Sequence, residues 1–180
     1  MTGRILLCGL NGTGKSTLGR ALAELLGRPF LDIENYWFPE RQDGDAYETS
    51  RAPEEVFHAL HADLVRYPDC ILASVKGNVG EENRHLFTAA IWLHAPKEIR
   101  MQRIMDRSYA KFGDRMRAGG ELYETEQRFF DMTASRSEEE VGAGLRRLNV
   151  PVIHADGTLP VAENAERLAR GLKQVEPFGV

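Results

Sequence analysis

Residues 5–18 read Ile5-Leu-Leu-Cys-Gly-Leu-Asn-Gly-Thr-Gly-Lys-Ser-Thr-Leu18, and this stretch decides the fold. Residues 9–16 satisfy G-x-x-x-x-G-K-[ST], the pattern of a phosphate-binding loop. The apolar run before it is typical of a buried strand, and the leucine spacing after Lys15 predicts a helix over 15–26. The alternative is a glycine-rich turn that only joins strand to helix. We favour the phosphate loop because strand, glycines and helix follow in the order that the motif requires.

The motif assigns chemistry to individual residues of the loop. Its backbone N–H groups are expected to point inward at a triphosphate, at the positive end of the helix dipole. The Lys15 ammonium is expected to reach the β- and γ-phosphates, and the Ser16 hydroxyl to bind Mg²⁺. ATP and Mg²⁺ are therefore the expected cofactors. The expected nucleotide contacts in this stretch are Leu10, Asn11, Gly12, Thr13, Gly14, Lys15, Ser16 and Thr17.

The length of 180 residues indicates one domain over residues 1–180. The chain has 42% hydrophobic and 28% charged residues, and its net charge is −4. That charge gives no support to nonspecific nucleic-acid binding or to an anionic membrane surface. Residues 100–117 differ from the rest, with six basic residues against two acidic ones. A local basic excess in an acidic chain favours a small anion over a long polyanion.

The cysteines and the first residues predict a compartment. Cys8 and Cys70 fall in predicted buried strands without the spacing of a metal site, so we expect reduced core residues. Residues 1–4 pass straight into the first strand, which argues against a secretory leader, and no apolar run is long enough to span a membrane. We therefore expect a cytoplasmic protein. The sequence leaves monomer and homodimer open.

Alternating strand and helix patterns predict an α/β fold. Strands are predicted at 4–8, 29–33, 70–75, 89–94 and 151–154, and helices at 15–26, at 53–66, after Pro96, over 121–148 with an interruption near Gly142 and Gly144, and after Pro160. The expected architecture is a three-layer sandwich around a five-stranded parallel sheet. Met101, Ile104 and Met105 are expected to be buried on the helix after Pro96, and Val161 on the last helix.

Parallel strands place their carboxyl ends at one edge of a sheet, where the ligands of such folds bind. This edge is expected to bring Asp32, Lys76 and Asp156 beside the phosphate loop. Three arginines on the helix after Pro96 have the spacing to share a face other than the apolar one. They are Arg100, Arg103 and Arg107.

The chain resembles the small P-loop kinases, namely the nucleoside-monophosphate kinase group and its shikimate- and gluconate-kinase relatives. The resemblance covers nearly the whole length. It rests on residues 9–16, on Arg103-Ile-Met-Asp-Arg107 after a strand, and on the turn Asp156-Gly-Thr-Leu-Pro160. It implies a P-loop NTPase fold with strand order 2-3-1-4-5 and a helical lid at about 107–126.

The resemblance also implies roles outside the loop. Asp32 is implied to organise Mg²⁺ with Ser16 and to act on the acceptor hydroxyl, and Glu34 to contact the acceptor. Arg103 and Arg107 are implied to contact the nucleotide, and Gly157 to lie beside the adenine. The implied catalytic residues are Lys15, Asp32 and Arg107.

The third strand departs from the pattern of these kinases. Residues 73–78 read Ala-Ser-Val-Lys-Gly-Asn, without a Walker B acid and without the glycine triplet of shikimate kinases. Lys76 is therefore a candidate partner for an anionic group on the acceptor. The other expected acceptor contacts are Arg51, Gly77, Asn78, Arg115 and Arg117.

Several of these residues have a structural alternative. Asp32 could cap the turn after its strand, and Arg103 and Arg107 could form a solvated helix face balanced by Asp106. Residues 36–38, which are all aromatic, suit the core as well as a wall of the acceptor site.

The function that fits is an ATP- and Mg²⁺-dependent kinase acting on a small-molecule acceptor, at a hydroxyl or a phosphate. Two alternatives remain open. One is a nucleotide-binding regulatory NTPase that acts through a protein partner, which the missing Walker B acid favours. The other is a polynucleotide 5′-hydroxyl kinase, which the negative charge and the lack of a long basic stripe disfavour.

Overall fold

Five parallel strands form the sheet at the centre of the molecule. The computed structural model describes residues 3–38 and 50–174. Its strands are β1 (Arg4–Cys8), β2 (Phe30–Asp32), β3 (Ile71–Ser74), β4 (Phe87–His94) and β5 (Val152–Asp156), in the order β2-β3-β1-β4-β5. Every neighbouring pair is parallel. The predicted architecture and strand order are confirmed.

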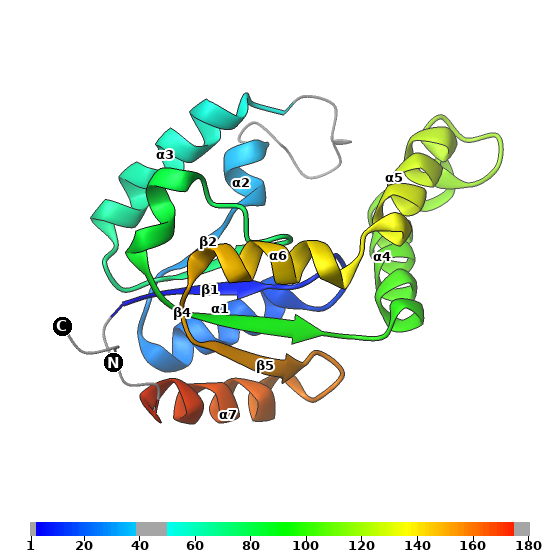
Figure 1. Cartoon of the computed structure of the whole chain (residues 1–180). Coiled ribbons are helices and arrows are strands. Elements are labelled where there is room, and N and C mark those ends of the chain that lie inside the picture. Colours follow the sequence, from blue (N-terminus) through cyan, green and yellow to red (C-terminus); the bar gives the residue numbers. More distant parts are fainter. Residues whose placement is uncertain (1–2, 39–49, 175–180) are drawn as a thin grey trace.

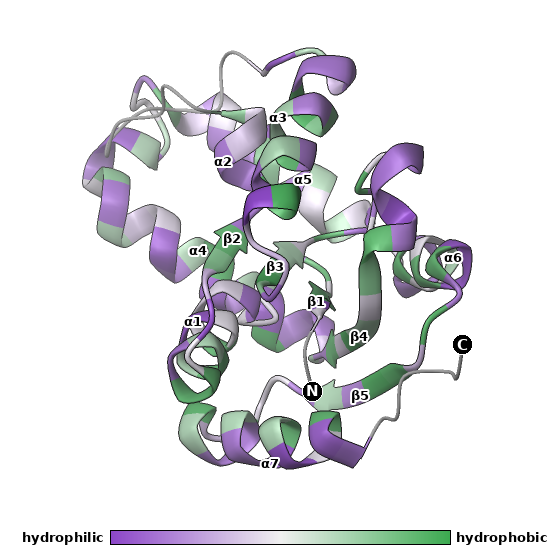
Figure 2. Ribbon diagram, turned by 90° about the vertical axis from the view of Figure 1, so that its left-hand side faces the viewer, coloured by the Kyte–Doolittle hydropathy of each residue, from purple (hydrophilic) through white to green (hydrophobic). Residues whose placement is uncertain are grey.

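Helices cover both faces of this sheet (Figure 1). One face carries α1 (Lys15–Leu26) and α7 (Val161–Gln174), and the other carries α3 (Pro53–Arg66) and α6 (Glu138–Leu148). Because side chains alternate along a strand, Ile5 and Leu7 pack with α1 and α7, whereas Leu6 and Cys8 pack with α3 and α6. Figure 2 shows β1 and β3 as hydrophobic strands between the helices. Burial on both faces explains why these strands are continuous apolar runs in the sequence.

A helical hairpin leaves the sheet after β4 and returns before α6. It consists of α4 (Lys97–Phe112), the 3₁₀ helix η2 (Gly113–Met116) and α5 (Tyr123–Ser135), and it projects to one side of the sheet in Figure 1. Residues 107–126, the expected lid, lie in this hairpin. The remaining elements are the short helix α2 (Glu34–Trp37) and the 3₁₀ helix η1 (Glu81–Leu86). Within residues 3–38 and 50–174, no helix is both long and apolar enough to cross a membrane.

The long helix predicted over 121–148 is interrupted at Arg136 and Ser137, and not near Gly142 and Gly144. Ser137 precedes α6, and its backbone N–H donates to the Glu140 carboxylate at 3.2 Å. This contact satisfies an N–H group that the start of α6 would otherwise leave without a partner. The position of the break is therefore set by the capping of α6, and the glycines do not interrupt it.

The two glycines lie inside α6 because the helix approaches the sheet closely there. A Cβ at Gly142 would lie 3.0 Å from the Trp92 ring, and a Cβ at Gly144 would collide with the backbone carbonyl of Lys76. The prediction was wrong because it treated these residues as helix breakers, whereas Gly142 leaves room for the Trp92 ring and Gly144 lets α6 approach the backbone at Lys76.

Substitution of Gly144 by alanine tests this close approach. We expect Gly144→Ala to lower the free energy of unfolding by about 2 to 3 kcal/mol, because backbone must move to admit the methyl group. Gly171→Ala on α7 is the matched control, since its Cβ would meet only Ile153 at an ordinary 3.7 Å. There the higher helix propensity of alanine should raise stability by up to about 1 kcal/mol. Urea unfolding measures both, and equal effects at the two sites would contradict this account.

Two predicted core positions are on the surface. Met105 is 39% exposed and Val161 is 40% exposed, whereas Arg100 is only 4% exposed. The inner face of α4 carries Arg100 and Ile104 because it packs against the phosphate loop, and the Arg100 carbonyl lies against Gly12. A helix that packs on polar backbone does not need the apolar stripe that was predicted for it.

Candidate functional site

The stretch between β1 and α1 folds into a tight loop that leads into the first turn of α1. Gly12 and Gly14 have φ angles of +81° and +97°, a region that side chains other than glycine rarely enter. The Thr13 hydroxyl donates to the Leu10 carbonyl at 2.9 Å and fixes the turn from inside. No described side chain caps the first turn of α1, and that turn contains no acidic residue. Its N–H groups and the helix dipole therefore favour an anion at this point.

Lys15 provides a cation at the centre of this loop. Its Nζ donates to the Leu10 carbonyl at 3.2 Å. Burial lowers the pKa of Lys15 from 10.5 to about 8, although Glu34 and Asp32 favour its charged form. The ammonium is thus incompletely neutralised, and a bound polyphosphate would supply the missing negative charge.

The lowered pKa of Lys15 predicts a pH-dependent uptake of a proton when ATP binds. Near pH 9 most of the unliganded protein has a neutral Lys15, and the phosphates will restore its charge. We expect uptake close to one proton per site at pH 9, almost none at pH 7, and weaker ATP binding as pH rises above about 8. Calorimetric titration in two buffers of different ionisation enthalpy measures the uptake. Equal uptake at both pH values would contradict the assignment.

Ser16 and Asp32 bring two oxygen ligands together beside Lys15. The Ser16 hydroxyl donates to Asp32 Oδ2 at 2.8 Å, and the backbone N–H of Glu34 donates to Asp32 Oδ1 at 3.2 Å. The short strand β2 aims Asp32 at the loop because it ends there, next to β3. A hydroxyl and one carboxylate, with phosphate oxygens and water, form the donor set that Mg²⁺ prefers.

These groups line a single pocket of about 210 Å³. Its cations are Lys15, Arg103 and Arg107, and its anions are Asp32 and Glu34. The pocket thus combines the charges that phosphate and metal require. Its other lining residues are Asn11, Gly12, Gly14, Ser16, Thr17, Ile33, Ser74 and Val75.

A second cavity of about 250 Å³ adjoins the first, and Gly14, Thr17 and Arg103 line both. Gly157 lines only the second cavity, where its N–H donates to the His94 carbonyl at 2.6 Å and its carbonyl accepts from Arg103 at 3.0 Å. A side chain at Gly157 would collide with the Thr13 carbonyl. The further lining residues are Thr13, Leu18, Leu93, Leu159, Val161 and Asn164, a largely apolar set that suits a base.

Lys76, Gly77 and Asn78 do not line the pocket that holds Asp32 and Glu34. They line a different hollow beside α6, and Lys76 Nζ forms an ion pair with Glu140 at 2.7 Å. The expectation that Lys76 lies at the phosphate edge was therefore wrong. Its physical reason is the turn after β3, where Gly77 has a φ of +70° and the chain turns toward α6.

Asp156 closes its own turn instead of facing the phosphate loop. Its Oδ1 accepts from the backbone N–H of Thr158 at 2.8 Å and from the Thr158 hydroxyl at 2.7 Å. These two hydrogen bonds lower the pKa of Asp156, and the one from the Thr158 hydroxyl has the larger effect. A carboxylate already satisfied in this way acts as a turn cap.

The remaining expected acceptor contacts also lie away from this pocket. Arg115 pairs with Glu121 at 2.6 Å, and Arg117 pairs with Asp114 at 3.0 Å, both exposed on the hairpin. Arg51 is exposed just before α3. Residues 36–38 precede residues 39–49, which lie outside the described part of the chain. In α2, the Tyr36 hydroxyl donates to Asp63 at 2.7 Å, and Trp37 packs edge-on against Phe57, so both support α3.

Two arginines that contact the phosphate loop were missing from the predicted site. Arg100 Nη1 donates to the Asn11 carbonyl at 3.2 Å, and Arg136 Nη1 donates to the Asn11 side-chain oxygen. The spacing of Arg100 with Arg103 and Arg107 was the available signal, but arginines are rarely buried, so this spacing by itself predicts a face other than the buried one. No sequence pattern indicated Arg136, because it is a single residue in a helix break that was not predicted.

Relatives of known sequence extend over much of the chain. A family model described as an AAA domain matches residues 5–128. The uncharacterised protein YqaC of Bacillus subtilis is 27% identical over 176 residues, which cover 93% of this chain and 96% of that protein. The shikimate kinase of Psychrobacter arcticus is 34% identical over 109 residues, which cover 55% of this chain and 58% of that kinase. The chain therefore spans little more than half the length of that kinase.

Solved structures share the fold at low sequence identity. A shikimate kinase from Bacteroides thetaiotaomicron superposes with a TM-score of 0.60 at 18% identity, covering 96% of this chain and 99% of that one. A gluconokinase from Sinorhizobium meliloti gives a TM-score of 0.51 at 19% identity, covering 96% of each chain. The chain therefore belongs to the AAA-domain family, and its predicted resemblance to the P-loop small-molecule kinases of the shikimate and gluconate kinase group is confirmed.

Proposed function

We propose that this protein transfers the γ-phosphoryl group of ATP, with Mg²⁺, to a hydroxyl group of a small molecule. The observation that carries the proposal is the meeting of Lys15, the Ser16–Asp32 pair and Arg107 in one pocket at the start of α1. Phosphoryl transfer depends on the positioning of the reactants and on the stabilisation of charge, and each of these groups contributes to one of the two.

The triphosphate would lie in the loop with its oxygens on the amide groups and on Lys15. Lys15 and Arg107 would balance the charge that develops on the transferring group. Arg103 and Arg107 lie on α4 and line this pocket, where their guanidinium groups would lie over the γ-phosphate and help to exclude water.

Mg²⁺ would be held by Ser16 and Asp32 together with phosphate oxygens. Their 2.8 Å contact fits this assignment, because it places a hydroxyl and a carboxylate within the span of one ion's ligand shell. When bound, Mg²⁺ supplies Lewis-acid neutralisation of the β- and γ-phosphate oxygens. Asp32 also lies where it could accept a proton from an incoming hydroxyl, and Glu34 would position that acceptor.

The charges around the acceptor side favour a hydroxyl over a phosphate. Asp32 and Glu34 line the pocket there, and two carboxylates would repel a phosphate acceptor. The candidate acceptors are therefore polyhydroxylated small molecules, and nucleoside monophosphates, which would bring a dianionic phosphate to these carboxylates, are disfavoured.

Acceptor-dependent release of ADP tests this function. The panel comprises shikimate, gluconate, other sugar acids, nucleosides, nucleoside monophosphates and a 5′-hydroxyl oligonucleotide, each with ATP and Mg²⁺. We expect one hydroxylated small molecule to raise ADP release well above the rate with water, and Lys15→Met to abolish the increase. If the protein binds ATP and no acceptor raises the release of ADP, the kinase proposal is contradicted.

A second candidate is a nucleotide-dependent switch read by a protein partner. The observation in its favour is the end of β3, where Ser74 occupies the place of an acid and its hydroxyl accepts from the Gly77 N–H at 3.2 Å. This candidate predicts tight ATP binding, no transfer to any acceptor, and recovery of a partner in one nucleotide state only.

A further inference from the structure

Both ends of the α4–α5 hairpin contact a single residue of the phosphate loop, Asn11. Arg100, in the first turn of α4, donates from Nη1 to the backbone carbonyl of Asn11 at 3.2 Å. Arg136, the residue that follows α5, donates from Nη1 to the side-chain oxygen of Asn11. Asn11 itself is 8% exposed and lines the phosphate pocket. The loop is thus held from both ends of the hairpin by charged donors outside its own motif.

Arg100 is buried under the loop at an energetic cost. Its side chain is 4% exposed, and its Nε has no hydrogen-bond partner among the described residues. Burial lowers the pKa of Arg100, and Glu138 and Glu98 oppose that shift by stabilising the cation. A buried guanidinium with one unsatisfied donor stabilises the folded protein less than an apolar side chain at the same position would. We therefore look for the role of the Arg100–Asn11 contact in function.

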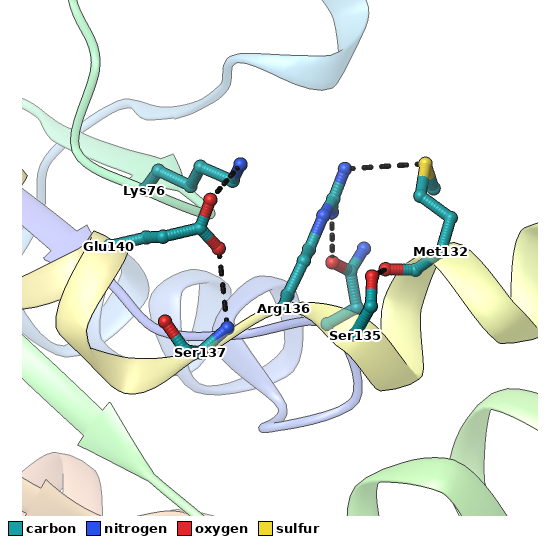
Figure 3. Close-up of polar contacts among 7 residues, drawn as sticks. Lys76, Met132, Ser135, Arg136, Ser137 and Glu140 are labelled. Atoms are coloured by element: carbon teal, nitrogen blue, oxygen red, sulfur yellow. Dashed lines mark hydrogen bonds and ion pairs between the residues drawn. The ribbon is translucent and has the colours of Figure 1, made fainter.

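Arg136 is aimed at Asn11 by the break between α5 and α6. Figure 3 shows Arg136 at this junction, with its guanidinium beside the Met132 sulfur at 3.8 Å. The next residue, Ser137, is fixed by Glu140, which also pairs with Lys76 at 2.7 Å (Figure 3). The start of α6 is therefore tied to the loop after β3, and the direction of Arg136 depends on that attachment.

We propose that Arg100 and Arg136 are positioning residues that hold Asn11, and with it the outer turn of the phosphate loop, in the conformation that binds the triphosphate. They act through Asn11 and do not touch the nucleotide themselves. This inference rests on the proposed function, because it assigns the two arginines to the same ATP site. Because both arginines bind Asn11, the position of the α4–α5 hairpin also depends on the conformation of the phosphate loop.

The two contacts use different atoms of Asn11, which allows them to be separated. Asn11→Ala removes the side-chain oxygen that accepts from Arg136 but keeps the backbone carbonyl that accepts from Arg100. In a double-mutant cycle, Arg136→Leu should therefore add nothing to Asn11→Ala. Arg100→Met should add its full effect to Asn11→Ala, because its own contact survives that substitution.

Titration with Mg²⁺ and a fluorescent ATP derivative, N-methylanthraniloyl-ATP, tests the proposal. We expect Arg136→Leu, Asn11→Ala and Arg100→Met each to raise the Kd about tenfold, the scale of one charge-assisted hydrogen bond. Arg136→Lys should recover part of the loss because it keeps one donor. Arg170→Leu, an exposed arginine on α7, is the matched control and should leave the Kd unchanged. Melting temperatures are recorded in parallel, and the Arg136–Asn11 cycle tests the proposal even where Arg100→Met fails to fold.

Two results would overturn the inference. The first is a wild-type Kd in Arg136→Leu. The second is an undiminished effect of Arg136→Leu in the Asn11→Ala background, which would mean that Arg136 acts on something other than Asn11. Failure of the wild-type protein to bind the derivative would instead refute the proposed nucleotide site, so the two failures are distinguishable.

Discussion

Lys15→Met will lower kcat/KM for phosphoryl transfer by about 10³-fold or more and will raise the melting temperature of the nucleotide-free protein by a few degrees. The loss of activity follows from the place of Lys15 in the phosphate loop, where its ammonium would contact the β- and γ-phosphates of bound ATP. No other cation replaces it within the loop motif itself, residues 9–16.

The gain in stability follows from the same residue's environment. Burial disfavours the charged form of Lys15 more than Glu34 and Asp32 favour it, so its pKa falls to about 8. At pH 7 the folded protein must hold a partly desolvated cation, and methionine removes that penalty. As pH rises from about 8 toward 10.5, the unfolded chain binds the Lys15 proton more tightly than the folded chain. The wild type should therefore gain stability over that range relative to Lys15→Met.

Differential scanning fluorimetry at pH 7, with and without Mg²⁺-ATP, measures the gain in stability and the loss of ATP binding, and steady-state kinetics with the acceptor measure the loss of kcat/KM. ATP should raise the melting temperature of the wild type and leave that of Lys15→Met unchanged. Lys97→Met, an exposed lysine at the start of α4, is the matched control and should behave as the wild type. Equal thermal shifts with ATP in Lys15→Met and the wild type would contradict the assignment.

Asp32→Asn will reduce kcat by about 10² to 10³-fold while the fold remains intact. The amide retains the shape of the carboxylate and can still contact the Ser16 hydroxyl, so little stability is lost. It loses the negative charge that would hold Mg²⁺ and accept the proton of the incoming hydroxyl. The KM for ATP should rise less than kcat falls, because the loop amides and Lys15 remain.

Steady-state kinetics at increasing Mg²⁺ concentration distinguish the two roles of Asp32. A rate that recovers with added Mg²⁺ indicates weakened metal binding, whereas a rate that stays low indicates loss of the proton acceptor. Asp106→Asn is the matched control, since Asp106 lies exposed on α4 and accepts a hydrogen bond from Gln102 at 2.8 Å, away from the pocket. A kcat for Asp32→Asn within twofold of the wild type would remove Asp32 from the mechanism.

The elements with strong sequence signals were predicted almost to the residue. The strand at 4–8 and the helices at 15–26 and 53–66 have the predicted bounds, because apolar periodicity and terminal glycine or proline agree at these places. The errors have a common cause. Gly142 and Gly144 were interpreted from local propensity, but their role depends on the approach of a strand and a loop that are distant in sequence.

The site could be predicted where it is local and not where it depends on packing. Residues 11, 12 and 14–16 lie on one loop and Asp32 lies at the carboxyl end of β2, so motif and topology together bring them into one pocket. The contact of Arg136 with Asn11 joins residues 125 positions apart, and no periodic pattern encodes it. The ion pair that turns Lys76 toward Glu140 likewise depends on α6, and the start of α6 was not predicted.

A crystal structure with Mg²⁺ and a nonhydrolysable ATP analogue tests the central claim most directly. The account predicts the β- and γ-phosphates on the amides of residues 9–16 and on Lys15, with Mg²⁺ bound by Ser16 and near Asp32. A triphosphate bound elsewhere, or a metal ion far from both Ser16 and Asp32, would contradict it.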